Sequence, residues 1–467
     1  MAMWIPDLSR FSGPAYTALA EAIGTAISDG SLSAGERLPP QRDLAWRLGL
    51  SLSTVTRGYG EAVRRGFLEG SVGRGTYVRD AKAVTAAASG AWNAGLARPA
   101  GDAIDFANNL PPLGGAERQL AETLGAISGE PGLGVFLDHW PGRTAERHAE
   151  AAGAWIETLG LPHQGRSIVL TNGSQQGLFV ALLALARPGD AILAEALSYA
   201  PVLAAAERLG LRVFPVAMDG EGLLPQSLDE QCKATAARLL YTMPTLHTPT
   251  TATMSEARRR AVAEVAERHG IDILEDDVFG FLPRSRPAPL GAWLPDQTIY
   301  VASTSKSLAP GLRVGYLSAP MRHERALRAG VALSSWMPPP LMAEIATRWI
   351  EDGTAERLNE EKRQAAEARQ ALARATLKGS RLAADLACFH LWLHLPKGWR
   401  PDAFEAAAQR EGVALRSAQS FCVDPAVAPA AVRLCLSHEA SHSRVEDGLW
   451  RLKRLLDERP GEAAFIV

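Results

Sequence analysis

Residues 303–316 read STSKSLAPGLRVGY, and this stretch decides the fold of most of the chain. It follows a short apolar, β-prone run, so Lys306 lies just beyond the end of a predicted strand. Hydroxyl side chains flank the lysine, and Arg313 follows seven residues later. A lysine forms a Schiff base only after it loses its proton, which burial and a cationic neighbour both favour. The stretch therefore predicts a Schiff-base lysine beside a phosphate site formed by Ser303, Ser305 and Arg313.

Short apolar runs alternate with segments of helical length on both sides of this stretch. The runs are residues 167–170, 191–194, 211–216, 239–242, 271–274 and 298–301. Apolar strands separated by helices are typical of a mainly parallel sheet that is buried between helices. We therefore expect an α/β fold over residues 104–467.

Three more segments place polar residues beside predicted strands. Residues 171–177, TNGSQQG, lie between a strand and a helix, and a helix start offers backbone N–H groups to an anion. Residues 275–279, EDDVF, follow a strand directly. Residues 432–437, VRLCLS, contain Arg433, whose planar guanidinium suits a ligand carboxylate. Each segment alone is compatible with an ordinary structural role.

In this order, over about 260 residues, the segments resemble those of fold-type I aminotransferases. The resemblance implies that pyridoxal phosphate forms an aldimine with Lys306, the catalytic lysine. It also implies that Asp276 pairs with the pyridinium nitrogen, which keeps the ring an electron sink. The other implied contacts are phosphate binding by Ser174, Gln175, Ser303, Ser305 and Arg313, ring stacking by Tyr199, and binding of a ligand carboxylate by Arg433.

The chain departs from the aminotransferase pattern in three places. Thr248 stands where the enzymes usually have asparagine before proline, and Phe279 stands where they usually have tyrosine. Both missing groups would hydrogen-bond the cofactor's phenolic oxygen; Thr248 can partly replace one bond, whereas Phe279 has no donor. Residues 138–142 lack the tyrosine that a neighbouring subunit often supplies, although His139 lies near its position. Each lost hydrogen bond weakens cofactor binding by about 1 kcal/mol, which phosphate contacts and the covalent aldimine can offset. These departures therefore favour a bound cofactor without efficient turnover.

The N-terminal residues predict a DNA reader. Residues 15–28 and 41–48 have helical patterns, and Ser51 can cap a third helix over about 52–65. Two helices joined by a glycine-containing turn, the second opening on small hydroxyl residues, suit a helix-turn-helix. Residues 66–78 predict two strands around a glycine-rich hairpin with an arginine at its tip.

Charge supports this interpretation. Residues 37–79 contain eight arginines and only three acidic residues, in a chain whose net charge is −2. An arginine count alone would equally fit a solvated helical face. Residues 30–78, however, resemble the winged helix-turn-helix of the GntR family over nearly its whole length. The resemblance implies DNA contacts from Arg42, Ser53, Thr54, Thr56 and Arg57, and from Arg74, Gly75 and Thr76 in the wing.

A reader, a linker and an aminotransferase-like domain, in this order, resemble the MocR-type regulators of the GntR family. We expect the reader in residues 1–79, an Ala- and Gly-rich linker in 80–103 and the large domain in 104–467, with about 350–467 as a smaller α+β subdomain. The resemblance implies a homodimer that binds a double-stranded DNA operator and responds to a small amino compound. The effector, the operator sequence and the direction of regulation are not indicated by any motif.

Length and composition agree with this class. The chain has 467 residues, of which 47% are hydrophobic and 21% charged, as in soluble proteins with more than one domain. No basic run precedes an apolar segment at the N-terminus, and no apolar stretch is long enough for a membrane span. The four cysteines lack metal-binding spacing, so we expect reduced thiols and no metal site. These features predict a cytoplasmic protein.

Two alternatives remain open at this point. The first is a catalytically active pyridoxal phosphate-dependent aminotransferase with a residual DNA-binding domain, against which Thr248 and Phe279 count. The second is a regulator whose large domain no longer holds a cofactor. Measurable turnover with an amino acid and a 2-oxo acid would favour the first, and the absence of an aldimine absorption band after reconstitution would favour the second. A screen of amines for changes in the cofactor spectrum, followed by DNA-binding assays, would identify the effector.

Overall fold

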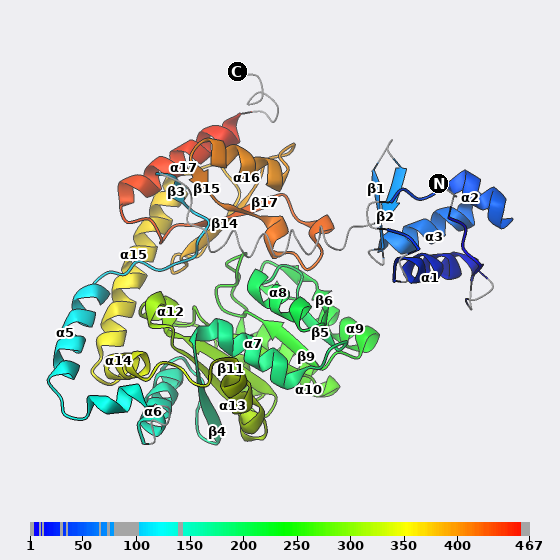
Figure 1. Cartoon of the computed structure of the whole chain (residues 1–467). Coiled ribbons are helices and arrows are strands. Elements are labelled where there is room, and N and C mark those ends of the chain that lie inside the picture. Colours follow the sequence, from blue (N-terminus) through cyan, green and yellow to red (C-terminus); the bar gives the residue numbers. More distant parts are fainter. Residues whose placement is uncertain are drawn as a thin grey trace. The chain divides into compact units, whose positions relative to one another are not determined.

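The computed structural model describes residues 4–8, 11, 14–28, 31–33, 36–64, 67–71, 75–78, 102–138 and 143–458. The chain divides into two compact units, Met1–Ala94 and Gly95–Val467 (Figure 1). No helix in these described ranges is long and apolar enough to cross a membrane. The predicted linker and wing tip, including Arg74, fall almost entirely outside the described residues.

The described residues of the first unit form three helices and a two-stranded sheet. The elements are α1 (Ala15–Ser28), α2 (Gln41–Leu48), α3 (Leu52–Arg64), β1 (Leu68–Ser71) and β2 (Gly75–Val78). The two strands are antiparallel, with Leu68 opposite Val78. Gly49 ends α2 at a φ of 65°, and the Ser51 hydroxyl accepts the Thr54 N–H at 3.1 Å, which begins α3. The winged helix-turn-helix predicted from the sequence is confirmed.

The second unit is built on a seven-stranded sheet of order β4-β12-β11-β10-β9-β5-β6. Its strands are β4 (Arg166–Thr171), β5 (Ala191–Glu195), β6 (Arg212–Val216), β9 (Leu239–Thr242), β10 (Asp272–Asp276), β11 (Thr298–Ser303) and β12 (Gly315–Pro320). β12 is antiparallel to both β11 and β4, and the other neighbouring pairs are parallel. The predicted α/β fold with a mainly parallel sheet is confirmed.

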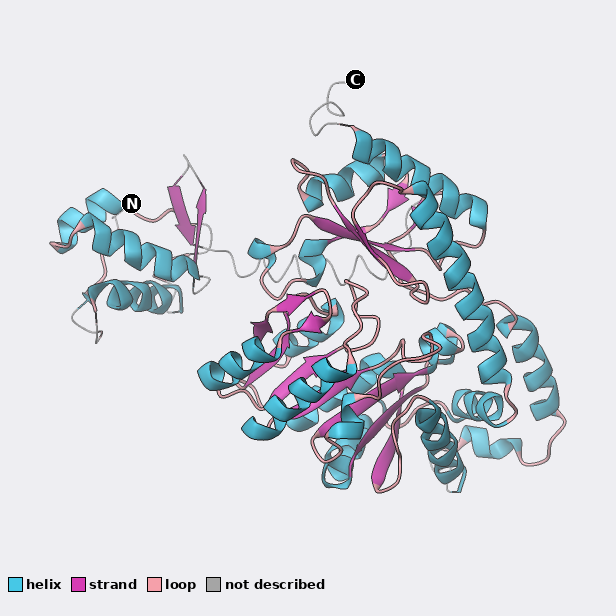
Figure 2. Cartoon of the chain, turned by 180° about the vertical axis from the view of Figure 1, so that it is seen from behind, coloured by secondary structure: helices cyan, strands magenta, loops and turns pink. Residues whose placement is uncertain are grey.

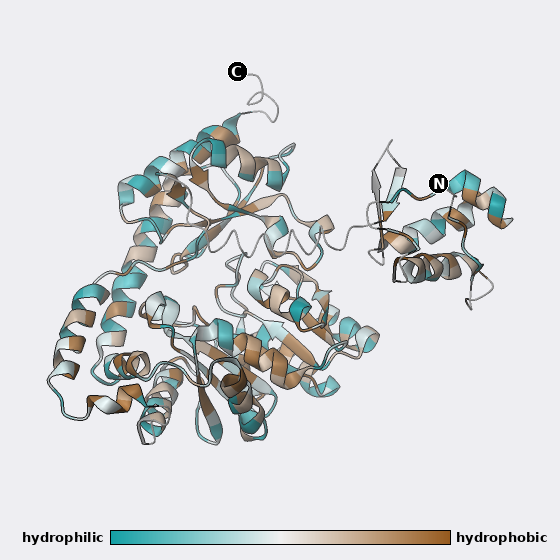
Figure 3. Ribbon diagram, in the orientation of Figure 1, coloured by the Kyte–Doolittle hydropathy of each residue, from teal (hydrophilic) through white to brown (hydrophobic). Residues whose placement is uncertain are grey.

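Helices lie on both faces of this sheet (Figure 2). They include α6 (Arg143–Thr158), α7 (Gly173–Leu185), α8 (Ala200–Arg208), α9 (Pro225–Thr235), α10 (Glu256–His269), α11 (Leu290–Trp293), α12 (Thr304–Ser307), α13 (Met321–Ser335) and α14 (Pro340–Glu351). Along β5, Ile192 and Ala194 join one apolar core, whereas Ala191 and Leu193 join another. Side chains alternate across a strand, so both faces of the sheet are apolar and buried. Figure 3 shows that hydrophobic residues dominate the central strands of this sheet.

A smaller lobe holds a four-stranded sheet of order β13-β14-β17-β16. Its elements are β13 (Leu382–Ala383), β14 (His390–His394), β15 (Val413–Ala414), β16 (Arg416–Ser417), β17 (Ala431–Cys435), α16 (Pro401–Arg410) and α17 (His442–Asp457). The long helix α15 (Thr354–Thr376) connects the two lobes, and α5 (Ala116–Ser128) lies near its start in Figure 1. All four cysteines are free and buried, as expected for small apolar side chains.

The chain enters the second unit through the smaller lobe. The short strand β3 (Ile104–Asp105) pairs in parallel with β15, and Ile104 and Phe106 belong to the smaller lobe's core. A Cβ on Gly448 of α17 would lie 2.7 Å from the Phe106 ring, so the helix packs tightly on this segment. This anchoring leads the next residues, 107–109, to Lys306 and Arg433.

Candidate functional site

Lys306 lies where β11 passes into α12. The Ser303 hydroxyl accepts the Ser305 N–H at 3.1 Å and so begins this short helix. The Lys306 amine donates a hydrogen bond to the backbone carbonyl of Asn109 and lies 6.0 Å from the centre of the Phe279 ring. Burial lowers the pKa of Lys306 to about 8. The amine therefore loses its proton much nearer neutral pH than an ordinary lysine does.

Asp276 is the last residue of β10, and only one of its two carboxylate oxygens accepts a side-chain hydrogen bond. Its Oδ2 accepts the Tyr241 hydroxyl at 2.9 Å from the neighbouring strand β9. Its Oδ1 is buried and has no hydrogen-bond partner among the described residues. Burial raises the pKa of Asp276 to about 7. A cationic ring nitrogen would satisfy the free oxygen and hold the carboxylate in its charged form.

Arg313 and the start of α7 pack closely together and form what we call the Arg313 cradle. Gly173 has a φ of +74°, and a Cβ there would lie 2.8 Å from Nη2 of Arg313. A Cβ on Gly315 would lie 2.5 Å from the backbone carbon of Gly173, so both glycines are needed for this approach. Arg313 donates to the Asn172 carbonyl at 3.0 Å. The Ser305 hydroxyl is buried without a partner in the described part of the chain.

The remaining predicted cofactor contacts lie around this cradle. Ser174 and Gln175 are in the first turn of α7, and Gln175 is exposed. Gln175 and Arg313 line a cavity of about 470 Å³ that also borders α8 and α13. Tyr199 precedes α8; burial, followed by the charge of Asp276, raises its pKa to about 12. The structure thus brings these residues to one end of the sheet, and their roles stay predictions.

Arg433 is buried on β17 of the smaller lobe. Its Nη2 donates to the Ala107 carbonyl at 2.6 Å, and its guanidinium carbon lies 4.7 Å from the centre of the Phe421 ring. Its Nε is buried and has no partner within the described ranges. The arginine thus faces the Lys306 site with donor capacity left for an anion.

The two substituted positions are both buried. Thr248 precedes Pro249 in a cis peptide bond, and Phe279 packs edge-on against Phe389 at 6.2 Å. The ring of Phe279 lies 5.8 Å from that of His390, a fully buried histidine. Burial lowers the pKa of His390 to about 3, so the imidazole is neutral.

Three residues of this site were not predicted from the sequence: Tyr241, Asn109 and His390. Tyr241 and His390 lie in ordinary strands and Asn109 in a loop, and no local motif marks any of them. Only the neighbouring position of β9 and β10 indicates that a tyrosine on one strand can reach an aspartate on the other. Asn109 and His390 reach Lys306 only through contacts between the two lobes.

In the reader, the predicted DNA contacts are mostly exposed. Arg42, Ser53, Thr56 and Arg57 are exposed and Thr54 is half-buried. The Thr56 hydroxyl donates to the Gln41 side chain at 2.8 Å, and the Arg57 guanidinium lies 4.1 Å above the Tyr16 ring. Gly75 begins β2 and Thr76 pairs with Gly70 of β1, whereas Arg74 lies outside the described residues.

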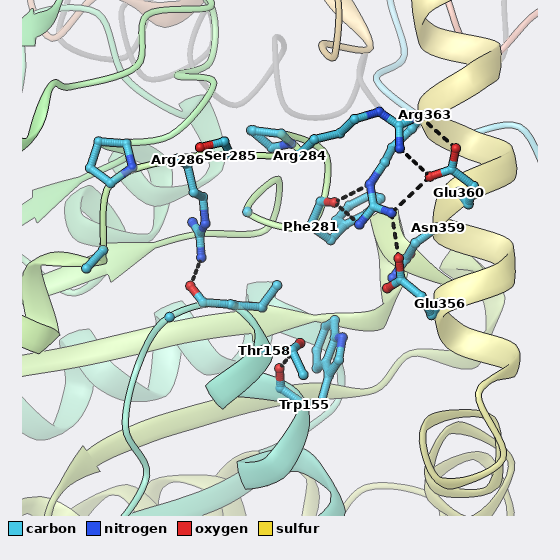
Figure 4. A pocket seen from close by; sticks show the side chains of 16 residues that line it. Trp155, Thr158, Phe281, Arg284, Ser285, Arg286, Glu356, Asn359, Glu360 and Arg363 are labelled. Carbon is cyan, nitrogen blue, oxygen red and sulfur yellow. Dashed lines mark hydrogen bonds and ion pairs between the residues drawn. The ribbon is translucent and has the colours of Figure 1, made fainter.

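A separate cavity of about 590 Å³ lies between the end of α6, residues 280–288 and α15 (Figure 4). Its charged side chains already pair with one another or with the backbone. Arg363 bonds Glu356, Glu360 and the Phe281 carbonyl, and Arg286 bonds Asp277 and the Leu159 carbonyl. Tyr300 also donates to Asp277. This network fixes the chain directly after Asp276.

Comparisons with known proteins identify both units. Residues 144–446 match the family Aminotransferase class I and II, and residues 15–78 match the bacterial regulatory proteins of the gntR family. An uncharacterized HTH-type transcriptional regulator of Bacillus subtilis, YdeF, is 30% identical over 97% of both chains. The Escherichia coli regulator YjiR is 31% identical over 39% of this chain and 40% of its own.

Solved structures agree on the fold of the second unit. Kynurenine aminotransferase of Pyrococcus horikoshii superposes with a TM-score of 0.71 at 23% identity, covering 85% of this chain and 98% of the other. LysN, an alpha-aminoadipate aminotransferase of Thermus thermophilus, gives 0.69 at 24% identity over 79% and 96%. The chain belongs to the HTH-type transcriptional regulators in which a GntR reader is fused to an aminotransferase class I and II domain. This is the architecture expected of a MocR-type regulator.

Proposed function

We propose that this regulator binds pyridoxal phosphate at Lys306 and uses it to sense a small amino compound. The observation that carries the proposal is the free, buried Oδ1 of Asp276, which lies within electrostatic range of Lys306. A buried acceptor without a partner is unfavourable unless a ligand satisfies it. The unpartnered hydroxyl of Ser305 leaves a second polar group free for the phosphate. These groups fit the cofactor at both of its polar ends.

Particular residues would hold each part of the cofactor. Arg313, Ser303, Ser305, Ser174 and Gln175 would bind the phosphate, with the start of α7 adding its backbone N–H groups. Asp276, held by Tyr241, would pair with the ring nitrogen. Tyr199 would cover the ring and Thr248 would face its phenolic oxygen. The cofactor, when bound, supplies an aldehyde that condenses reversibly with primary amines.

The chain's own residues favour capture of an amine over turnover. Burial makes the Lys306 amine easy to deprotonate, and Arg433 has donor capacity for a carboxylate near it. Phe279 replaces a donor with an apolar ring in the interior. Efficient transamination needs tuned proton transfer at the lysine, and this side chain cannot contribute a hydrogen bond to that tuning. We therefore assign the site to sensing.

The reader would provide the output. Its exposed arginines and small hydroxyls lie on or beside the second helix of the helix-turn-helix and can contact phosphates and base edges. The resemblance to MocR-type regulators implies a homodimer, which would present two readers to two half-sites of an operator. Occupancy at Lys306 would then change how both half-sites are engaged.

The test is spectroscopic. Purified full-length protein reconstituted with pyridoxal phosphate should show the absorption band of a lysine-bound cofactor, and Lys306→Ala should lose it. Lys362→Ala is the matched control. Burial also lowers the pKa of Lys362 to about 8, but Lys362 is not one of the residues that would hold the cofactor. A band that survives in Lys306→Ala, or that is absent from the wild type, would refute the proposal. Rapid formation of a 2-oxo acid from an amino acid would instead favour the aminotransferase alternative.

A further inference from the structure

We propose that Asn109 recognises a hydrogen-bond donor on the amino compound and so restricts the effector to amino acids with a hydroxyl, amide or N–H group in the side chain. This inference rests on the proposed sensing function at Lys306. Nothing in the aminotransferase motifs assigns a role to this side chain.

Asn109 is held between the two residues that would bind the ends of an amino acid. The Asp105 carboxylate accepts the N–H groups of Ala107 at 2.9 Å and Asn108 at 3.0 Å, which fixes the turn. Arg433 donates to the Ala107 carbonyl at 2.6 Å, and Lys306 donates to the Asn109 carbonyl. A ligand that reaches both Lys306 and Arg433 therefore passes beside Asn109.

His390 fixes the orientation of the Asn109 amide. Its Nε2 lies 3.2 Å from the backbone carbonyl of His247, and a carbonyl can only accept, so Nε2 carries the proton. Burial keeps the imidazole neutral, so Nδ1 has a lone pair. The Asn109 Nδ2 lies 3.1 Å from Nδ1 and donates to it. The Cys388 thiol, 3.2 Å from the same nitrogen, is compatible with this tautomer because it can also donate.

Because the amide nitrogen of Asn109 contacts His390, its amide oxygen is the atom that stays available to a ligand. The Asn109 Oδ1 is buried and has no hydrogen-bond partner among the residues that the structure describes. A ligand donor would satisfy this oxygen, whereas an apolar group of equal size would leave it unpaired and desolvated. A side-chain carboxylate would place a second acceptor against it. The site therefore distinguishes amino acids of similar shape by a single donor group.

The experiment compares amino acids of nearly identical size that differ in one group. Reconstituted full-length protein is titrated with serine against 2-aminobutyrate, threonine against valine, and homoserine against norvaline. Two readouts are used: the change in the cofactor spectrum and the ligand-induced rise in Tm. In the pair that fits the site, the hydroxyl member should bind about tenfold more tightly in both readouts.

Two variants separate recognition from structural support. Asn109→Leu keeps the size but removes the acceptor, and it should bind both members of the pair about equally. Asn109→Gln keeps both an amide donor for His390 and an acceptor oxygen, and it should retain part of the preference. Equal binding of both members by the wild type, or an undiminished preference in Asn109→Leu, overturns this inference alone. A cofactor spectrum that responds to none of the six amino acids overturns it together with the sensing function.

Discussion

The two candidate sites of this chain differ most in their exposure. Arg42, Ser53 and Arg57 of the reader lie on its surface, whereas Asp276 and Arg433 are only 2% and 7% exposed. DNA is a large polyanion that a protein must meet from outside, and its contacts depend on charge in water. A small amine is instead enclosed, and there burial shifts the proton affinities of the groups that meet it. The comparison predicts different responses to mutation.

Lys306→Ala should have the largest effect, and it should affect the buried site but not the DNA-binding reader. It removes the amine that attaches the cofactor, so attachment and the response to amino compounds should be lost completely. DNA affinity without effector should stay within twofold of the wild type, or about 0.4 kcal/mol. Absorption spectra and a fluorescence anisotropy titration with operator DNA measure the two effects. Loss of DNA binding in a folded variant would contradict the separation of the sites.

Asp276→Asn should weaken cofactor binding strongly. The variant replaces the carboxylate that would pair with a ring cation, and a hydrogen bond between charged groups contributes about 2 kcal/mol. An equilibrium titration with pyridoxal phosphate measures this loss. Asp272→Asn is the control, because Asp272 begins the same strand and pairs with Arg322 outside the site. Equal losses in both variants would indicate general destabilisation of β10.

Cofactor attachment should rise with pH. The pKa of Lys306 in the folded chain is about 8, below its ordinary value, so the reactive neutral amine is abundant above pH 8 and is lost as the pH falls. Well below pH 8 the initial attachment rate should fall about tenfold for each pH unit. Stopped-flow absorbance follows this rate. A rate that keeps rising to pH 10 would show an unperturbed lysine.

Arg57→Ala should have the smallest effect and should act on the other site. A contact with DNA phosphate is partly screened, so we expect a loss of about 1 kcal/mol at moderate salt. The slope of log affinity against log salt should decrease by about 1. Arg410→Ala, which removes an exposed arginine from the second unit, is the control and should change neither quantity. If the slope of log affinity against log salt were unchanged in Arg57→Ala, Arg57 would not contact the DNA phosphates.

The same difference in exposure explains what the sequence could predict. The reader depends on local signals, and both α1 and α2 begin and end at the expected residues, with the Ser51 cap in place. Lys306 and Asp276 were also identifiable, because each lies at or just beyond the end of a strand and within a motif. The antiparallel direction of β12 was not, since an apolar run has no direction.

The contacts that complete the buried site could not be predicted from short stretches of sequence. Tyr241 reaches Asp276 only because β9 and β10 are neighbours, and Asn109 reaches His390 across 281 positions of the chain. Ser303 shows the opposite case. It was predicted as a phosphate ligand, yet its hydroxyl also begins α12 by accepting the Ser305 N–H. Such double use depends on three-dimensional contacts that spacing does not contain.

Occupancy of the buried Lys306 site should control DNA binding by the exposed reader. This control is tested most directly by measuring the operator affinity of the reconstituted full-length protein with and without an amino acid that changes its cofactor spectrum. We predict a change of at least tenfold in affinity, equivalent to about 1.4 kcal/mol of coupling, that disappears in Lys306→Ala. An amino acid that changes the spectrum but leaves DNA affinity unaltered, or alters it equally in Lys306→Ala, would contradict the account.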